Sequence, residues 1–217
     1  MFPSHVITIH NQVFWLSPNK SIFWEAQKIL ILSDIHLGKT NHFRKAGIPI
    51  PNAIGKNDLH KLTQDIQYYK PTQVIIVGDM FHSIANQEHD AVSKWLANYA
   101  HITFTLVQGN HDILAREWYA THHIQMVRGL MLINEFAFVH EPNQASSQAL
   151  FTFSGHIHPG ITIKGKGKQS LRFPCFYIEP TYCILPAYGS FTGLATITPS
   201  KAAQVYAIAE HHIVRVV

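Results

Sequence analysis

The sequence predicts an α/β protein in which two β-sheets face each other and helices cover their outer sides. In the first half of the chain, short apolar runs of strand length alternate with amphipathic stretches of helical period. This alternation predicts parallel strands joined by right-handed crossovers. The second half contains many short strand-like runs and little helical periodicity, which predicts a second sheet packed on the first. No repeat, low-complexity tract or linker interrupts the sequence, so we expect residues 1–217 to form a single domain.

The composition is that of a globular protein with a large core. Of the 217 residues, 47% are hydrophobic and 14% are charged, which excludes a disordered chain. Lys and Arg outnumber Asp and Glu by 17 to 13, a mild excess that suits polyanionic substrates. The chain has neither a signal-peptide pattern nor an apolar run of about 18 residues, so we expect a cytoplasmic protein without a membrane segment.

Hydrophobic periodicity assigns the elements of the first half. Alternating apolar residues on both sides of Ser17-Pro18-Asn19-Lys20 predict a two-stranded antiparallel ribbon over residues 5–25. Continuous apolar runs predict strands that are buried on both faces, and apolar residues at spacings of three and four predict helices. The strands are expected at 28–33, 73–77 and 102–107, and the helices at 59–70, 87–100 and 112–122.

The second half is assigned mainly to short strands. They are expected around 124–127, 130–133, 136–139, 151–154, 175–178, 181–185, 192–198, 204–208 and 212–217, with a basic Gly-rich loop at 164–170. The two cysteines, Cys175 and Cys183, flank a hairpin turn at Glu179-Pro180. A two-residue turn would put them on opposite faces of the hairpin, whereas a three-residue loop would bring them opposite one another. We predict two free thiols.

Five polar motifs each follow an apolar run of strand type, and strand ends are where α/β folds place their chemistry. The motifs are Asp34-x-His36, Gly78-Asp79, Gly109-Asn110-His111-Asp112, His140-Glu141 and Gly155-His156-x-His158-Pro159. Each motif alone has a structural explanation, such as a capped turn or a buried histidine with its hydrogen bonds satisfied. Five such motifs in succession instead predict one cleft lined by metal ligands. The candidate ligands are Asp34, His36, Asp79, Asn110, His140, His156 and His158.

Seven ligands exceed what one ion needs when positions for water and substrate stay open. Two metal ions that share one carboxylate fit this number, and Asp79 is the expected bridge because it follows the central strand. Imidazole and oxygen donors without thiolate favour Mn, Fe or Zn over Mg, Ca or Cu(I).

The order of these motifs resembles that of the calcineurin-like metallophosphoesterase superfamily, over Ile29 to Pro159. The resemblance implies a four-layer α/β/β/α sandwich of two mixed sheets flanked by helices, with a dinuclear site at the sheet edges. It also implies that His111 is the catalytic imidazole. The ligands implied for the first metal are Asp34, His36, Asp79 and His158, and those for the second are Asp79, Asn110, His140 and His156.

Three further strings, at residues 34–49, 165–176 and 185–193, resemble the bacterial metallophosphoesterases associated with DNA ligase and helicase operons. Members of that group are described as DNA damage response endonucleases. The resemblance implies single-stranded DNA as the substrate, a role in DNA repair and a functional association with DNA ligase or helicase. We expect two divalent ions, most simply Mn²⁺, to activate water for attack on phosphorus. His111, charged and oriented by Asp112, would protonate the leaving oxygen.

Two basic runs are candidates for substrate binding. Lys39 and Arg44 follow the first motif closely enough to grip a phosphate in the cleft, and Phe43 would offer a stacking face. If the 164–170 loop folds over the mouth of the cleft, its cations would track a polynucleotide backbone. These cations are Lys164, Lys166, Lys168 and Arg172. The alternative explanation is a solvated charged surface and a core Phe.

The leading hypothesis is therefore a Mn²⁺-dependent phosphodiesterase that cleaves single-stranded DNA internally. One alternative is hydrolysis of a small or lipid-linked nucleotide, but an apolar lid for acyl chains has little room between the motifs. Another is a non-catalytic scaffold, which would be expected to lose ligands. This sequence keeps all seven ligands and His111.

Overall fold

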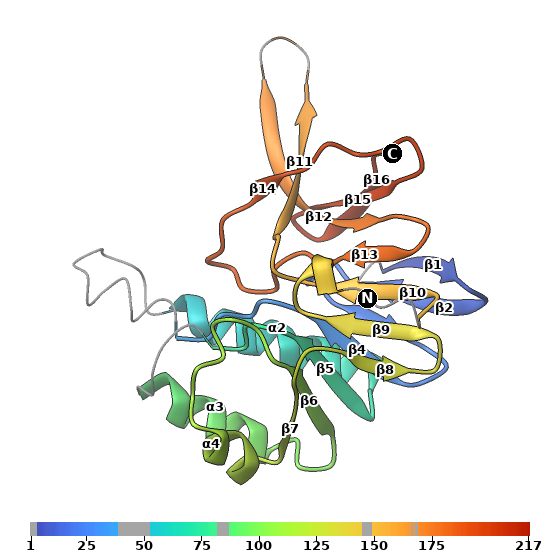
Figure 1. The fold of residues 1–217 in the computed structure, drawn as a ribbon. Coiled ribbons are helices and arrows are strands. Elements are labelled where there is room, and N and C mark those ends of the chain that lie inside the picture. Colours follow the sequence, from blue (N-terminus) through green and yellow to red (C-terminus); the bar gives the residue numbers. More distant parts are fainter. Residues whose placement is uncertain (1–3, 39–52, 82–86, 145–148, 166, 168) are drawn as a thin grey trace.

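In the computed structural model, two mixed β-sheets pack face to face, and α-helices cover the outer side of the first sheet (Figure 1). The structure describes residues 4–38, 53–81, 87–144, 149–165, 167 and 169–217. The predicted α/β class with two mixed sheets is confirmed. Of the two helical layers that the resemblance implied, the described residues form only the one on the first sheet. Within the described residues, no helix is long and apolar enough to cross a membrane.

The first sheet has the strand order β1-β2-β3-β4-β5-β6-β7. Strands β4 to β7 are parallel, as the continuous apolar runs predicted, and β1 to β3 extend the sheet beyond β4 in antiparallel order. Their bounds are β1 His5–Ile9, β2 Gln12–Leu16, β3 Ile22–Trp24, β4 Ile29–Leu32, β5 Gln73–Val77, β6 Thr103–Val107 and β7 Ile124–Val127.

Three α-helices of the described residues pack on this sheet through a shared apolar cluster. They are α2 (Ala53–Tyr69), α3 (Gln87–Ala97) and α4 (Arg116–Thr121). Helix α4 begins four residues later than the predicted helix at 112–122, because Asp112 and the residues after it belong to the loop of the third motif.

The N-terminal ribbon has three strands, so the predicted two-stranded ribbon at 5–25 is wrong in this respect. A tight turn at His10-Asn11 separates β1 from β2, and both residues have positive φ, at 46° and 61°. Two-residue hairpins of this kind need left-handed backbone at both positions, which Asn adopts readily. His10-Asn11 is therefore a turn within the stretch that alternation predicted to be one strand.

The second sheet has the order β14-β11-β12-β13-β10-β9-β8, and β15 pairs with both β12 and β16. Strands β9, β10 and β13 are parallel. The bounds are β8 Met131–Ile133, β9 Phe136–Val139, β10 Phe151–Ser154, β11 Pro159–Lys164, β12 Ser170–Ile178, β13 Tyr182–Ile184, β14 Ala195–Thr196, β15 Gln204–Ala209 and β16 His212–Arg215, and a short 3-10 helix, η1, spans Pro142–Gln144.

The expected basic loop at 164–170 falls between the two strands of a long hairpin. Strand β11, which the sequence did not predict, begins directly after the last motif, and β12 starts at Ser170 rather than near 175. The two strands pair from Gly160 to Lys164 and project from the body of the protein (Figure 1). Cross-strand pairing stabilises this segment, and such pairing is not visible in the local sequence pattern.

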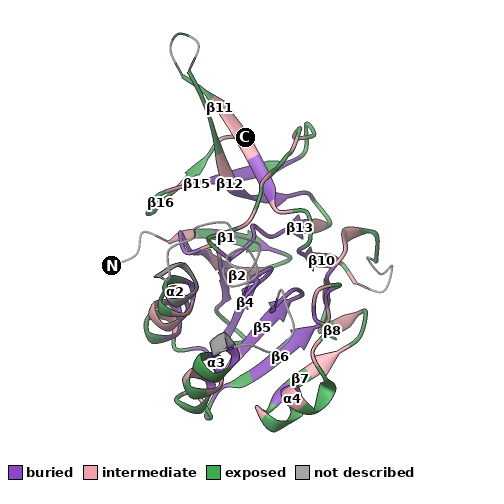
Figure 2. Ribbon diagram, turned by 90° about the vertical axis from the view of Figure 1, so that its left-hand side faces the viewer, coloured by how far each residue is buried: buried purple, intermediate pink, exposed green. Residues whose placement is uncertain are grey.

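The core between the sheets is rich in aromatic side chains. Phe14, Trp24, Phe136 and Phe153 are at most 1% exposed and lie with ring centroids 4.8 to 6.1 Å apart. Figure 2 shows the same burial along the central strands β5 and β6. Aromatic pairs at these spacings add attraction to the area that they bury. The two sheets are therefore joined by a continuous apolar layer.

The outer face of the second sheet is covered differently. Cys175, Tyr177 and Ile184 form a smaller cluster there with Ile197 and Ala203, which lie in the connection before β15. Among the described residues, α-helices pack on the first sheet only. The second half lacks amphipathic helical stretches, so connecting chain provides this cover.

Both cysteines are free and buried, which confirms the prediction of two thiols. The hairpin register pairs Ile178 with Cys183, and the Glu179 N–H donates to the Tyr182 carbonyl across a two-residue turn. Cys175 therefore faces outward while Cys183 faces the core between the sheets. Burial raises the pKa of Cys175 to about 12.

A buried carboxylate ties three parts of the chain together. Asp65, on α2, accepts hydrogen bonds from Ser17 Oγ (3.0 Å), Asn19 Nδ2 (2.9 Å) and Ser21 Oγ (2.8 Å) in the β2–β3 turn. It also accepts one from the Tyr188 hydroxyl (3.2 Å), which follows the second sheet. Burial raises the pKa of Asp65, while these four donors favour its charged form. The side chain anchors α2 to both sheets.

Replacing Asp65 with Ala should lower the free energy of unfolding by about 3 kcal/mol, because it leaves four buried donors without an acceptor. Urea denaturation measures the change. Asp90→Ala is the control, since Asp90 is exposed on α3 and its loss should cost less than about 1 kcal/mol. Equal losses in the two variants would contradict the anchoring role.

Candidate metal centre

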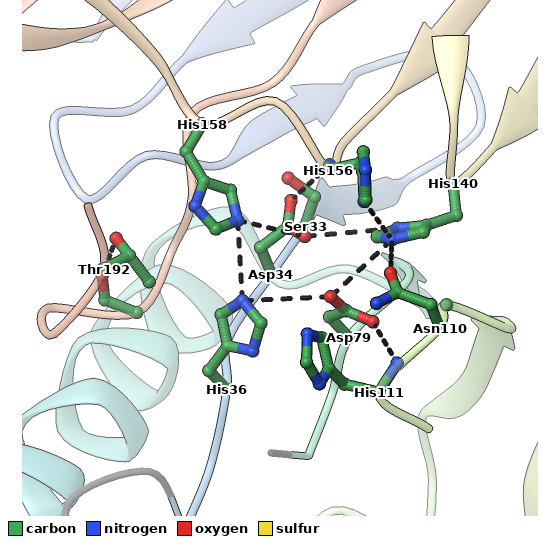
Figure 3. A network of polar contacts seen from close by, with 12 residues as sticks. Ser33, Asp34, His36, Asp79, Asn110, His111, His140, His156, His158 and Thr192 are labelled. Carbon is green, nitrogen blue, oxygen red and sulfur yellow. Dashed lines mark hydrogen bonds and ion pairs between the residues drawn. The ribbon is translucent and has the colours of Figure 1, made fainter. Parts of the chain in front are cut away.

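The five motifs lie at the carboxyl ends of five strands. Three motifs follow β4, β5 and β6 of the first sheet, and two follow β9 and β10 of the second. Because neighbouring strands are parallel within each group, their ends meet along one edge where the sheets face each other. Figure 3 shows the side chains of the motifs turned toward a common centre. The structure brings together Asp34, His36, Asp79, Asn110, His140, His156 and His158.

Two groups of these side chains have the spacing of a metal site. In the first group, ligand atoms of Asp34, His36 and His158 all lie within 4.8 Å of one another. His158 Nε2 is 3.4 Å from Asp34 Oδ1 and 3.5 Å from His36 Nε2. Three donor atoms therefore converge from two motifs of opposite sheets.

The second group consists of Asp79, His140 and His156. His140 Nε2 is 3.6 Å from Asp79 Oδ2, 3.1 Å from His156 Nδ1 and 2.9 Å from Asn110 Oδ1. Asp79 Oδ2 is also 3.9 Å from His36 Nε2 of the first group. This single oxygen lies between the two groups, where a carboxylate shared by two ions would be placed.

Each carboxylate commits one oxygen to the backbone of another motif. The His156 N–H donates to Asp34 Oδ2 (3.0 Å), and the His111 N–H donates to Asp79 Oδ1 (2.9 Å). The second oxygen of each carboxylate is left to the cleft. Asp34 Oδ1 is buried and accepts no hydrogen bond from the described residues.

This donor set fits a pair of divalent cations. A buried carboxylate oxygen without a hydrogen bond is costly unless a cation neutralises it. Imidazole and oxygen donors suit a borderline transition metal ion. His140 Nδ1 lies 3.4 Å from the Val77 carbonyl, a contact that orients the ring with Nε2 toward the cleft. The floor of the site is buried, whereas Asn110 and His156 are exposed at its rim.

The backbone at the site adopts an unusual conformation. Five candidate ligands have positive φ although none is glycine: Asp34 (50°), His36 (53°), Asp79 (49°), His156 (68°) and His158 (53°). Left-handed backbone is uncommon for non-glycine residues and costs about 1 kcal/mol or more at each position. Such strain persists only where surrounding contacts fix the backbone, and it is concentrated at functional sites.

The Asp112 carboxylate accepts hydrogen bonds from three backbone N–H groups, and its role in orienting the His111 ring stays a prediction. Asp112 Oδ1 accepts the N–H groups of Met80 (2.9 Å) and Phe81 (3.3 Å), and Oδ2 accepts that of Gly109 (2.8 Å). Asp112 therefore fastens the loop of the second motif to the loop of the third. The His111 ring is half-buried, with its centroid 5.5 Å from that of His36.

Three buried carboxylates set the electrostatics of the cleft. Burial opposes ionisation of Asp34, but the His158 and His140 imidazoles, 3.4 and 4.0 Å from its Oδ1, hold its pKa below the usual value. Burial raises the pKa of Asp79, against the hydrogen bond from the His111 N–H. Burial also raises the pKa of Asp112 to about 6, against its backbone hydrogen bonds. The Asp34 charge also raises the pKa of Asp79, and a bound cation would offset this repulsion.

Comparison with known proteins agrees with this geometry. The family model "Calcineurin-like phosphoesterase" matches residues 27–181, which include all five motifs. The chain belongs to the calcineurin-like phosphoesterase family. A comparison with curated proteins finds no match.

Two solved structures are similar to this phosphoesterase. The crystal structure of Pseudomonas putida nuclease MPE aligns with a TM-score of 0.84 and 29% sequence identity, covering 98% of this chain and 100% of that one. The E. coli phosphoesterase Yfce aligns with a TM-score of 0.47 and 15% identity, covering 87% of this chain and 97% of that one.

The motif glycines of this phosphoesterase make room for ligands of other motifs. A Cβ at Gly78 would overlap the His140 ring, and Gly78 also has a φ of +80°. A Cβ at Gly109 would overlap the Asp79 carboxylate, and one at Gly155 would lie 2.5 Å from Asp34 Oδ2. In the three motifs that contain a glycine, the glycine is therefore required by close packing with a second motif.

A segment that the sequence analysis connected only with the family resemblance supports the first group. Ala187 forms a β-bridge with Ser33, and the Tyr188 N–H donates to the Ser33 carbonyl (2.8 Å). The Gly189 N–H donates to the Asp34 carbonyl (3.1 Å). This segment follows β13, so the second sheet fixes the backbone of a first-sheet ligand. The only sequence signal was the string at 185–193.

The predicted substrate-binding residues are divided between described and undescribed parts of the chain. Lys164 and Arg172 are exposed on the β11–β12 hairpin. The strands of this hairpin project from the body (Figure 1). The loop includes residues 166 and 168, which lie outside the described residues, and its folding over the mouth of the cleft stays a prediction. The remaining predicted residues lie outside the described ranges: Lys39, Phe43, Arg44, Lys166 and Lys168.

Gly109→Ala should weaken binding of Mn²⁺ by about 100-fold, because the new methyl group displaces the Asp79 carboxylate from between the two groups. Isothermal titration calorimetry measures the affinity and the number of ions bound. Gly193→Ala is the matched control, since a Cβ there meets no atom within 4 Å. Unchanged affinity in Gly109→Ala would show that the glycine is not needed for the ligand arrangement.

Asp112→Ala should release three backbone N–H groups and accelerate hydrogen exchange at Met80, Phe81 and Gly109. Turnover should fall by roughly 10- to 100-fold, because Asp79 and His111 lose their fixed positions. NMR-detected exchange on the metal-loaded enzyme reads the first effect. Glu117→Ala, at an exposed position on α4, is the control. Exchange rates that match the control would refute a bracing role.

Proposed function

We propose that this calcineurin-like phosphoesterase is a dinuclear-metal-dependent phosphodiesterase that cleaves single-stranded DNA internally, in DNA repair. The observation that carries the proposal is the pair of ligand groups with Asp79 Oδ2 between them. The similarity to a nuclease over almost the whole chain supports a nucleic acid as substrate. The association with DNA ligase or helicase stays a prediction.

Two sets of residues would hold the metal ions, which we propose to be Mn²⁺. When bound, two such ions lower the pKa of a coordinated water and neutralise charge on a phosphate oxygen. The first ion is assigned to Asp34, His36, Asp79 and His158, and the second to Asp79, Asn110, His140 and His156. The Asp34 and Asp79 carboxylates are oriented by backbone N–H groups, so each presents one fixed oxygen.

His111 is the proposed general acid. Its backbone N–H is fixed on Asp79, and its ring lies beside His36 without being part of either ligand group. A protonated imidazole there would donate its proton to the leaving oxygen of the cleaved phosphodiester. General acid catalysis of this kind contributes roughly 10²- to 10⁴-fold. Its effect is largest for leaving groups of high pKa, such as a deoxyribose hydroxyl.

The rim of the site supports a polymeric substrate over the alternatives. Exposed Asn110 and His156 form part of the rim, and the buried floor lies beneath them. A lipid-linked nucleotide would need an apolar enclosure for its acyl chains, for which the motif spacings leave little room. A non-catalytic scaffold would not need the paired ligand groups.

Incubation with circular single-stranded DNA and Mn²⁺, beside a small chromogenic phosphodiester, tests the function. A circle has no ends, so its conversion to linear and shorter pieces establishes internal cleavage. We expect both substrates to be hydrolysed. Hydrolysis of the small diester with an intact circle would overturn the DNA assignment and leave the phosphodiesterase chemistry standing.

His111→Ala should abolish cleavage of the circle and keep the full content of metal, since His111 belongs to neither ligand group. Asp79→Asn should abolish cleavage and also reduce the bound metal, because it weakens the shared oxygen ligand. Metal analysis by mass spectrometry and the circle assay are run on the same preparations. Full activity in either variant would remove the corresponding role.

A further inference from the structure

The β11–β12 hairpin has two chemically different faces. Cross-strand register pairs Ile161 with Phe173 and Ile163 with Leu171, so these apolar side chains share one face. On the other face, Thr162 pairs with Arg172 and Lys164 pairs with Ser170. The apolar face continues into the cluster on the outer side of the second sheet, which includes Cys175 and Tyr177.

The polar face, defined by Thr162, Lys164, Ser170 and Arg172, adjoins the metal centre. Arg172 Nη1 donates to the Leu194 carbonyl (3.4 Å), and the next residue, Ala195, donates its N–H to the His158 carbonyl (3.0 Å). The same face continues along β12 into Phe176 and Ile178, which point toward the first sheet. Polar side chains therefore lead outward along the hairpin from His158, half-buried at Thr162 and exposed at Lys164, Ser170 and Arg172.

Charge is distributed unevenly along the chain. Residues 142–217 hold six of the 17 Lys and Arg residues but only Glu179 and Glu210 among the 13 acidic residues. Their net charge of +4 equals that of the whole chain, so residues 1–141 are neutral. No acidic residue occurs between Glu141 and Glu179, the stretch that contains the hairpin. The cations of this stretch therefore have no acidic neighbour along the sequence, which favours binding of an anionic ligand.

The length of the hairpin sets the reach of this surface. Lys164 lies six residues beyond His158, which is about 20 Å along a strand at about 3.3 Å per residue. Arg172 pairs with Thr162 and so lies about 13 Å from His158 on the same scale. A stacked strand rises about 3.4 Å per nucleotide along its helix axis, so these lengths correspond to about four and six nucleotides measured along that axis.

We propose that the polar face of the hairpin binds backbone phosphates of the nucleic acid, about four to six nucleotides from the cleaved bond and only on the side where the strand passes His158. This inference rests on the proposed function for its substrate class. Guanidinium and ammonium groups bind phosphate without regard to base. The contact therefore raises affinity and sets the direction in which the strand binds, without creating a sequence preference. Small diesters and very short oligonucleotides do not reach it.

Two series of single-stranded oligonucleotides test the inference, each extended from a fixed cleavage position in one direction only. In the wild type, kcat/KM should rise by roughly tenfold as the strand reaches the hairpin, in one series and not in the other. The double variant Lys164→Ala/Arg172→Ala should lose most of this gain. Its matched control is Lys94→Ala/Arg116→Ala, which removes one exposed Lys and one exposed Arg from the helical layer.

Binding of a fluorescent 20-nucleotide strand, measured by anisotropy over a range of salt, gives a readout that does not depend on cleavage. Loss of two phosphate contacts should reduce the slope of log affinity against log salt by about 1.4. The single variant Lys164→Glu should weaken binding by charge reversal at an exposed position, so misfolding does not account for the effect. The control double variant should keep the wild-type slope.

The outcomes separate this inference from the proposed function. If the wild type cleaves DNA while hairpin and control variants have equal length gain and salt slope, the hairpin is not a phosphate-binding surface and the function stands. If the strand binds through the hairpin but is never cleaved, the endonuclease assignment falls and the hairpin surface stands. An equal rise in kcat/KM on extension in either direction would overturn the proposal that the hairpin binds the strand on one side of the cleaved bond only.

Discussion

The site depends on hydrogen bonds from the backbone of one motif to the carboxylate of another. The His156 N–H holds Asp34, and the His111 N–H holds Asp79, so each acid has one fixed oxygen and one oxygen that faces the cleft. The motif glycines allow this close approach, and Asp112 fastens two of the loops together. The motifs are thus parts of one interlocked structure, because each needs a neighbour to place its side chains.

Much of the fold followed from the sequence, because strands buried on both faces leave an unbroken apolar run. The runs at 73–77 and 136–139 coincide with the buried strands β5 and β9. The candidate site followed for a related reason. Parallel strands end at the same edge, so polar residues directly after such runs are placed together by topology alone.

The features that sequence missed arise from contacts between distant segments. Strand β11 exists because it pairs with β12, and Asp112 contacts Met80, which is 32 residues away. The left-handed backbone of Asp34 and Asp79 had no local signal either, since few residues other than glycine adopt it and the sequence does not show which ones do. The local sequence pattern thus predicted which residues are candidate ligands, whereas tertiary packing determines how their side chains are oriented.

Each ligand group draws side chains from both sheets. Asp34 and His36 follow the first sheet while His158 follows the second, and Asp79 follows the first while His140 and His156 follow the second. An ion bound to either group would act as a crosslink between the two layers. Its binding free energy would then add to the cohesion of the fold, because an ion that binds only the folded chain stabilises it by mass action. The ions that support catalysis would therefore also raise the thermal stability of the protein.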